Sequence, residues 1–580
     1  MKRKLGTLLL IVFSTCQYAY SQGLEKRHFD INKNIEIYNS VVKELDLFYV
    51  DSLDIEKTIR AGIVNMLASL DPYTNYITES DMEDFKYMTT GEYAGIGSYI
   101  AARKINDSYR VMISGPYEDM PAMKAGLKDG DIILSVDDED VTQLKDGNIS
   151  DPGYGGKLTS KVSSMLKGMA GTEVKIKVER TGEKKPLEFK IVRENIHVNS
   201  VPYFGVVENN VGYISFSGFT DKSAQEVKKA IIELKKQGVT SLILDLRGNG
   251  GGILEEAVQL VNFFVPRGEV VLSTKGKLKQ ADRIYRTTLS PIDTEIPLAV
   301  LIDRRSASAS EIVSGALQDM DRAVVIGERT FGKGLVQLTR ELPYGGSLKV
   351  TTSKYYIPSG RCIQAIDYAH RNDDGSIARI PDSLTTVFKT VVGREVRDGG
   401  GIVPDITIKE DKSPSISYYL VKDYIIFDFA TEWARKHPKK EFTESFEITD
   451  LDYESFKAFV KSKENFKYDM LSEKTLASLK EVMEYEGYMG TAQEELKALE
   501  AKLSPDLDRD LESFKNEIKQ MISVEIAKRY YYQKGEIRES LKSDKQVKEA
   551  VEILNNQVRY KEILSPANNN QQQKNKITEE

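Results

Sequence analysis

A short apolar strand followed at once by a cluster of glycines constrains this fold more than any other feature of the sequence. Residues 241–246 (SLILDL) have the continuous apolar character of a buried β-strand, and residues 248–252 (GNGGG) follow directly. From about residue 197 to residue 410, further apolar strands alternate with amphipathic helical stretches. Because such alternation places helical crossovers between parallel strands, the sequence predicts an α/β domain with a parallel sheet.

The flanking regions differ from this domain, residues 196–410, in their residue pattern. Apolar residues at spacings of three and four predict helices in residues 22–92, whereas residues 93–195 carry short alternating runs typical of a small β domain. Residues 411–565 are charge-dense with a helical period, and the polar residues 566–580 are expected to be disordered. These boundaries fit the roughly four domains that about 150 residues per domain predict for this length.

The first 21 residues have the pattern of a secretory signal. Three basic residues precede an apolar run over residues 8–13, and small residues lead to Ser21. We expect cleavage after Ser21 and export to the periplasm or cell envelope of a Gram-negative-type bacterium. Lipidation at Cys16 and an ordinary buried N-terminal segment are the alternatives. If Cys16 leaves with the signal, Cys362 is the only cysteine, so no internal disulfide is expected.

Composition excludes several classes of function. A net charge of −7 without a basic stripe argues against a nucleic-acid partner. Two Cys and four His nearly exclude a Cys/His zinc module, and we expect neither a metal nor a cofactor. None of the histidines lies in a turn that resembles a catalytic site, and each is interpreted as a surface or core residue. They are His28, His197, His370 and His437.

Two loops after predicted strands carry residue types suited to catalysis. In a parallel sheet, functional groups gather beyond the carboxyl ends of the strands. Residues 248–252 are rich in glycine, which lets the backbone approach a ligand and present N–H donors. Residues 305–311 (RSASASE) follow the predicted strand that ends at Ile302. Both loops are therefore candidates for a site at one edge of the sheet.

Ser308 in the second loop has two interpretations. With Glu311 three residues later and an apolar helix following, it fits a helix-capping box. At a helix N-terminus it could also be a nucleophile, because the helix dipole stabilises a developing alkoxide or oxyanion. The two roles are compatible, and on this segment alone capping is the stronger interpretation.

A serine nucleophile needs a base, and Lys333 is the candidate that the sequence offers. It lies between two glycines beyond the predicted strand at residues 323–326, on the same sheet edge as Ser308. Burial among apolar groups favours the neutral amine of a lysine, which can then accept a proton. A solvated loop lysine is the alternative.

The same loop contains a partial match to a nucleotide-binding motif. Residues 327–333 fit the first seven positions of a P-loop. Gly334 stands where that motif needs Ser or Thr to bind Mg²⁺, and the following residues look extended rather than helical. We therefore reject a nucleotide triphosphatase.

Five segments in a fixed order carry a resemblance to a known family. They are residues 245–252 (DLRGNGGG), 306–311 (SASASE), 327–334 (GERTFGKG), 355–361 (YYIPSGR) and 401–405 (GIVPD). Three segments of the β domain, residues 121–127, 130–133 and 171–180, resemble a PDZ domain. Over about residues 30–410, the chain resembles the carboxyl-terminal processing peptidases, or tail-specific proteases, of serine peptidase family S41.

The resemblance implies a crotonase/ClpP-like α/β catalytic core with an inserted PDZ-like β domain and helical N- and C-terminal regions. It also implies an exported serine endopeptidase that works through an acyl-enzyme, with Ser308 as nucleophile and Lys333 as base. Gln337 occupies the position of a third residue that orients the lysine, and its spacing of four would put both side chains on one face of a strand. The backbone N–H groups of Ala309 and of Gly251 or Gly252 would form the oxyanion hole.

In the PDZ-like domain, the resemblance implies a clamp for the free carboxyl end of a substrate. Gly95, Ile96 and Gly97 occupy the expected cradle, where backbone donors fit a carboxylate and an apolar neighbour fits an apolar terminal side chain. A plain hairpin turn is the alternative. The expected substrates are proteins or peptides with accessible apolar C-termini. Two further partners are considered: an adaptor protein that binds the C-terminal helical region, and other copies of the chain in a homo-oligomer.

Two departures limit the resemblance. Gly250 stands where many members have proline, which should only loosen the glycine loop. Residues 411–580 lie outside the core similarity, and they could form a stabilising appendage, a lid, an adaptor surface or a dimerisation element.

The rival function is a catalytically inactive module or scaffold of the same fold that holds peptides or lipids. The joint presence of Ser308, Lys333 and Gln337 favours the enzyme.

Overall fold

The computed structural model describes residues 26–566, except residues 106, 146, 372–376, 410–413, 438–445 and 464–465. The predicted signal, Cys16 and nearly all of the predicted disordered tail lie outside the described residues. The chain forms two compact units. The smaller comprises the chain up to residue 80 together with residues 337–351, and the larger comprises residues 81–336 and the chain from residue 352 onward.

The smaller unit combines helices with a short strand pair. Residues 26–48 form a helix, and α2 (Ile55–Ala68) follows it. Strand β1 (Asn75–Ile77) pairs antiparallel with the first part of β18 (Ser347–Tyr356). The sequence predicted only helices up to residue 92, and β1 corrects this prediction. Its partner strand is distant in the sequence, so no local pattern could have indicated it.

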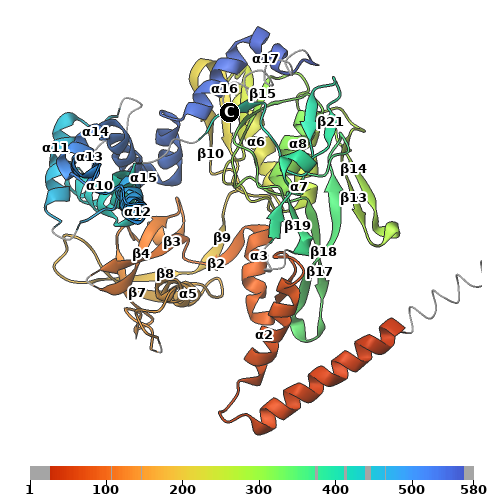
Figure 1. Ribbon diagram of the computed structural model, residues 1–580, viewed down its shortest axis with the longest axis horizontal. Coiled ribbons are helices and arrows are strands. Elements are labelled where there is room, and N and C mark those ends of the chain that lie inside the picture. Colours follow the sequence, from red (N-terminus) through yellow and green to blue (C-terminus); the bar gives the residue numbers. More distant parts are fainter. Residues whose placement is uncertain are drawn as a thin grey trace, which may run out of the picture. The chain divides into compact units, whose positions relative to one another are not determined.

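The larger unit begins with α3 (Met82–Thr90) and continues into the PDZ-like β domain (Figure 1). The main sheet of this domain has the strand order β3-β4-β5-β7-β8, with β6 paired to β5, while β2 pairs with β9. The strands are β2 (Glu92–Gly95), β3 (Ser98–Ile105), β4 (Ser108–Pro116), β5 (Ile132–Val136), β6 (Glu139–Asp140), β7 (Glu173–Glu179), β8 (Leu187–Val192) and β9 (Glu194–His197). Helices α4 (Pro121–Lys124) and α5 (Tyr154–Leu166) complete the domain, and buried residues of α5 pack against the sheet.

The predicted parallel sheet is present in the larger unit. Its order is β10-β11-β12-β15-β16-β23, and every neighbouring pair is parallel except the edge pair β10-β11. The strands are β10 (Tyr203–Val206), β11 (Val211–Ser215), β12 (Ser241–Asp245), β15 (Leu298–Ile302), β16 (Val324–Gly327) and β23 (Ile406–Thr407). All residues of β12 are buried, as its apolar sequence predicted.

Helices cover both faces of this sheet (Figure 1). Side chains alternate between the faces along each strand, so Leu244 joins one apolar core and Ile243 joins the other. The first core includes α6 (Ser223–Lys236), α7 (Leu254–Asn262) and α8 (Ala309–Asp319), and the second includes α16 (Lys545–Asn555) and α17 (Gln557–Ile563). Helices α16 and α17, which lie within the predicted C-terminal helical region of residues 411–565, therefore cover one face of the sheet.

Shorter strands complete the larger unit. β13 (Val270–Gly276) pairs with β14 (Arg283–Arg286) and with the second part of β18. Two hairpins follow: β19 (Ile366–Arg371) with β20 (Ile377–Arg379), and β21 (Val387–Lys389) with β22 (Glu395–Arg397). The chain after Gly334 enters a strand, β17 (Leu335–Glu341), most of which belongs to the smaller unit, and not the helix that a P-loop needs.

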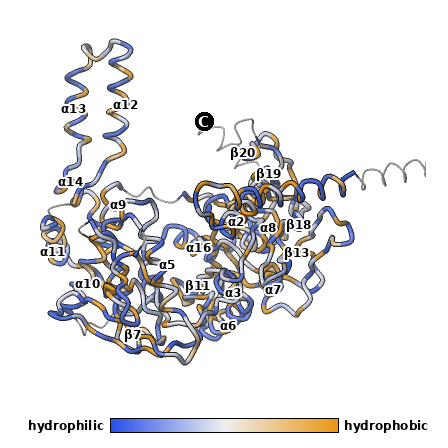
Figure 2. The backbone as a smooth tube through the Cα atoms, turned by 90° about the horizontal axis from the view of Figure 1, so that it is seen from below, coloured by the Kyte–Doolittle hydropathy of each residue, from blue (hydrophilic) through white to orange (hydrophobic). Residues whose placement is uncertain are grey.

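The C-terminal region is helical, as predicted. Its helices before α16 are α9 (Ser415–Lys422), α10 (Ile425–Lys436), α11 (Asp450–Lys461), α12 (Leu471–Tyr485), α13 (Gln493–Leu503), α14 (Leu507–Ser513) and α15 (Lys515–Leu541). Residues such as Trp433, Phe456 and Ile522 form a separate apolar core among them. Helices α12 and α13 run side by side as a hairpin (Figure 2). None of the described helices is both long and apolar enough to cross a membrane.

Candidate active site

Three loops leave the carboxyl ends of neighbouring parallel strands. The glycine loop, residues 246–253, follows β12; the serine loop, residues 303–308, follows β15; and the lysine loop, residues 328–334, follows β16. Because parallel neighbours end at the same edge of a sheet, the three loops meet where α/β folds place their functional groups. The two loops that carry Ser308 and Lys333 are thus on one edge, as predicted.

Ser308 caps helix α8 in a strained backbone conformation. Its φ is +56° and its ψ is −112°, a region that residues other than glycine rarely occupy. The residue is half-buried, whereas every residue of α8 is buried. Such strain persists only where neighbours enforce it, and it is common at functional sites. The geometry holds the serine at the positive end of a buried helix dipole.

Glu311 joins the serine loop to the lysine loop. Its carboxylate accepts hydrogen bonds from the backbone N–H groups of Ser308 (2.8 Å) and Lys333 (2.9 Å) on one oxygen. The other oxygen accepts from the Gly332 N–H (2.7 Å) and the Thr330 hydroxyl. Burial raises the pKa of the Glu311 carboxyl, and the four hydrogen bonds oppose that rise. Ser308 and Lys333 are therefore held close together through a single oxygen atom.

The predicted capping box accounts for only part of this role. The hydrogen bond from the Ser308 N–H is the Glu311 half of the box that the sequence indicated. The contacts of Glu311 with residues 330–333 lie outside the serine loop, so the capping pattern gave no signal for them. Glu311 is the functional residue whose second role the sequence analysis missed.

Glycines fix the path of the lysine loop. At Gly332, where φ is +90°, a side-chain Cβ atom would lie 2.3 Å from the Cβ of Ala365. At Gly334, it would lie 2.8 Å from the backbone nitrogen of Gln364. The Gly334 N–H donates to the Gln364 side chain at 2.7 Å. Lys333 itself is half-buried, between two glycines that no larger residue could replace without displacing the neighbouring chain.

The glycine loop packs directly against the nucleophile turn. At Gly251, where φ is +97°, a Cβ atom would lie 2.8 Å from the Cβ of Ser308 and 3.0 Å from the backbone nitrogen of Ala309. The Gly251 N–H donates to the Asn249 side chain at 2.9 Å, so this donor is already engaged. Ala309 and Gly252 are therefore the better candidates for the predicted oxyanion donors, and Gly251 contributes the close approach.

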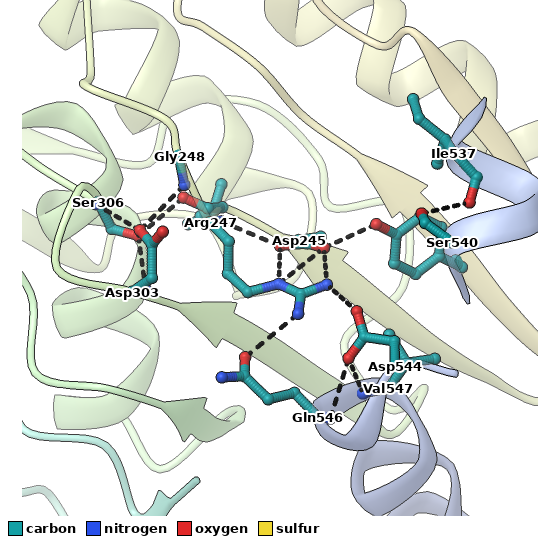
Figure 3. Close-up of polar contacts among 12 residues, drawn as sticks. Asp245, Arg247, Gly248, Asp303, Ser306, Ile537, Ser540, Asp544, Gln546 and Val547 are labelled. Carbon is teal, nitrogen blue, oxygen red and sulfur yellow. Dashed lines mark hydrogen bonds and ion pairs between the residues drawn. The ribbon is translucent and has the colours of Figure 1, made fainter. Parts of the chain in front are cut away.

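Buried polar residues attach the glycine loop to the serine loop. The Asn249 carbonyl accepts from the Ala307 N–H (3.1 Å) and from the Ser310 hydroxyl (2.9 Å). The Asp303 carboxylate accepts from the backbone N–H groups of Gly248 and Ser306, each at 2.9 Å (Figure 3). Burial acts to raise the pKa of Asp303, but the hydrogen bond from Gly248 and the contacts with Arg305 outweigh it, so the pKa is lowered.

Gln337 lies in strand β17, within the smaller unit. Its side-chain amide donates to the Thr351 hydroxyl at 3.2 Å. Lys333 precedes the strand, which begins at Leu335, so the argument that residues four apart share a strand face does not apply to this pair. The orienting role of Gln337 stays a prediction from the resemblance.

The predicted carboxylate cradle is a packed loop of the PDZ-like domain. The Ile96 side chain is only 3% exposed and belongs to the domain core. Its carbonyl accepts from the Ala122 N–H, and the Gly97 carbonyl accepts from the Tyr117 N–H. At Gly97, where φ is +73°, a Cβ would lie 2.6 Å from the Cβ of Met120. Ile96 thus faces the core and not a ligand, and any role in binding rests on the backbone of residues 95–97.

Three of the histidines have partners of their own. His197 contacts Glu226, His370 contacts Asp367, and His437 contacts the Trp433 carbonyl. Across the described ranges, no group of three or more His, Cys, Asp or Glu side chains is arranged to hold a metal ion.

The free thiol of Cys362 is half-buried, and burial raises its pKa.

Comparison with known families identifies three regions of the chain. Residues 210–369 match peptidase family S41, and residues 112–147 match the PDZ domain. Residues 416–554 match a family described as "Probable PDZ-protease, C-terminal helical domain". The last match extends through α15 and α16, so it includes the first helix that covers the second face of the sheet.

Individual relatives are similar to more than half of the chain. A carboxy-terminal-processing protease of Bartonella bacilliformis is 35% identical over 338 residues, which are 58% of this chain and 73% of that protein. A "Probable CtpA-like serine protease" of Staphylococcus aureus is 33% identical over 360 residues, 62% of this chain and 68% of that protein. A solved photosystem II D1 C-terminal processing protease is 26% identical, with a TM-score of 0.34, and covers 63% of this chain and 85% of its own. The chain therefore belongs to the carboxy-terminal-processing proteases of peptidase family S41, and it is a serine peptidase with a PDZ domain.

Proposed function

We propose that the enzyme cleaves peptide bonds with Ser308 as nucleophile and Lys333 as general base. The observation that carries this proposal is the Glu311 carboxylate, which accepts hydrogen bonds from the backbone N–H groups of both residues. A buried group that fixes the two loops together preorganises a nucleophile and its base. A module that only bound peptides would not need this arrangement.

The reaction divides into two steps. The neutral amine of Lys333 takes the proton of the Ser308 hydroxyl as Oγ attacks the scissile carbonyl carbon. The N–H groups of Ala309 and Gly252 stabilise the oxyanion. The C–N bond then breaks, the leaving amine receives the proton from Lys333, and an ester to Ser308 remains. Water, deprotonated by Lys333, hydrolyses this ester and regenerates the serine. A lysine base predicts activity that rises toward alkaline pH.

The proposed substrates are proteins of the cell envelope with accessible, apolar C-termini. The PDZ-like domain would bind the terminal carboxylate through backbone donors of residues 95–97. The signal pattern in residues 1–21 supports export to a periplasm or envelope. N-terminal sequencing of the mature chain distinguishes the options: a start at Gln22 fits cleavage after Ser21, and a lipidated Cys16 would contradict it. An adaptor on the C-terminal helical region remains part of the proposal.

A Ser308→Ala variant tests the proposed chemistry. It should abolish cleavage of an unstructured protein with an apolar C-terminus, while its thermal transition stays near that of the wild type. Ser314→Ala is a matched control, because Ser314 lies in helix α8 and its hydroxyl donates to the Ser310 carbonyl within the same helix. Full cleavage by Ser308→Ala would overturn the assignment. A wild-type chain that binds peptides without cleaving them would favour the inactive binding module.

A further inference from the structure

The start of the glycine loop contacts a residue near the far end of the chain. Arg247, next to Gly248, places its guanidinium between the carboxylates of Asp245 and Asp544 (Figure 3). Nη2 of Arg247 lies 2.7 Å from Oδ2 of Asp544. The side chains of Arg247 and Asp544 are only 20% and 18% exposed, so solvent and salt screen this ion pair weakly.

Asp544 is fixed in position by helix α16. Its Oδ1 atom accepts hydrogen bonds from the backbone N–H groups of Gln546 (2.9 Å) and Val547 (3.1 Å), which caps the helix. The helix in turn packs its apolar residues on the sheet. The carboxylate that meets Arg247 is therefore attached to a rigid layer of the α/β domain, and it is not a free surface group.

The glycine loop needs such support because of its own composition. Four glycines in five residues leave the isolated loop little conformational preference. An oxyanion hole works through donors that are already in place before the charge develops. Asp303 holds the Gly248 N–H from the serine loop. Arg247, the residue before Gly248, donates its backbone N–H to the Asp245 carboxylate (2.9 Å), and its guanidinium contacts the carboxylates of both Asp245 and Asp544.

We propose that Asp544 is a positioning residue for the oxyanion loop, so that the cap of helix α16 helps to hold the site in place. The proposal rests on Ser308 being the nucleophile. Asp544 acts through Arg247: it fixes the entry to the loop, so that the Gly252 N–H stays aligned with the oxyanion near Ser308. Since the oxyanion forms only in the transition state, loss of Asp544 should lower kcat and leave KM nearly unchanged.

Two substitutions at Asp544 separate the ion pair from the helix cap. Asp544→Asn keeps a good capping residue but removes the charge, whereas Asp544→Glu keeps the charge but caps poorly. The readouts are kcat and KM on an unstructured protein substrate, and the rate constant for labelling by a fluorophosphonate serine probe. We expect Asp544→Asn to lower kcat and the labelling rate by about tenfold to a hundredfold, with KM within about twofold. Asp544→Glu should keep most of the rate despite a lower thermal transition.

Glu549→Gln provides the matched control on the same helix. It removes the same charge and breaks an ion pair with Arg559, away from the glycine loop, so activity should stay at the wild-type level. Wild-type rates for Asp544→Asn, or equal losses for Asp544→Asn and Asp544→Glu, would overturn the positioning role. If the wild-type chain itself is not labelled at Ser308, the proposed function fails, and this proposal fails with it.

Discussion

The two faces of the parallel sheet are covered by helices that reach it in different ways. Helices α7 and α8 follow β12 and β15 directly, so the connections between strand and helix carry the glycine loop and Ser308. Helix α16 comes from the end of the chain and brings Asp544 to Arg247. The first face thus supplies the groups proposed for catalysis, and the second face supplies support. Local connections build the site, and distant segments hold it in place.

Among the substitutions that compare the two faces, the largest effect should come from breaking the link that Glu311 makes between the serine loop and the lysine loop. Glu311→Gln keeps the shape of the side chain but removes the charge that accepts four hydrogen bonds, and an amide nitrogen cannot accept from a backbone N–H. We expect kcat to fall by about a hundredfold and the thermal transition to drop. Steady-state cleavage assays and calorimetry measure both.

Glu255→Gln serves as the control for this change. Glu255 lies exposed in the first turn of α7, so its replacement should leave both quantities near the wild-type values. Wild-type kcat in Glu311→Gln would show that the shared oxygen does not position Ser308 and Lys333.

A pair of core substitutions compares the two faces directly. Ile312 lies in the first turn of α8, and Ile553 lies near the end of α16; both are buried. Replacing either by Ala should lower the free energy of unfolding by about 2–5 kcal/mol. Only Ile312→Ala should also lower kcat, because the cavity lies under the nucleophile turn.

Urea denaturation and cleavage assays well below the unfolding transition separate these outcomes. If Ile553→Ala lowers kcat as much as Ile312→Ala does, the face covered by α16 and α17 does not act merely as a rigid support for the site, and the comparison fails.

Asp303, which connects the glycine and serine loops, gives a pH-dependent test. Its lowered pKa means that its ionised form stabilises the fold above the unfolded-state pKa of about 3.9 and that this contribution is lost as the pH falls through the lower folded-state value. Asp303→Asn should therefore be less stable than the wild type at pH 7, and the difference should shrink below about pH 4. Denaturant midpoints from pH 3 to pH 7 provide the measurement. A difference that stays constant over this range would contradict the assigned role.

The smallest effect should come from Gly250. A Cβ atom at this position would meet no atom within 4 Å, and the residue is exposed. Gly250→Ala should keep kcat within about twofold and raise the free energy of unfolding by about 0.4–1 kcal/mol, because it restricts the unfolded chain. A large loss of kcat would mean that the loop needs its flexibility, and that the supports from Asn249, Asp303 and Asp544 do not fix its conformation.

Sequence patterns predicted the features that depend on nearby residues. An apolar run predicted the buried strand β12. Glycine and serine residues directly after such runs predicted the serine loop and the lysine loop. The contacts that hold the site are of another kind: Glu311 reaches residues 330–333, and Asp544 reaches Arg247. Both depend on how strands and helices pack in three dimensions, and no period or motif in the sequence encodes them.

The same limit explains two features of the fold that the sequence did not indicate. Strand β1 forms because β18 lies beside it, although its surroundings in the sequence are helical. Helices α16 and α17 have the same charged, amphipathic pattern as the preceding helices, so the sequence did not indicate that they pack on the sheet.

Mapping the residue that reacts with a serine-directed fluorophosphonate is the most direct test of the proposed dyad. Mass spectrometry of the labelled wild-type chain should find the adduct on Ser308, with a labelling rate that rises toward alkaline pH. Lys333→Ala should remain folded and lose nearly all labelling. An adduct on another serine, or labelling of Lys333→Ala at the wild-type rate, would contradict the account.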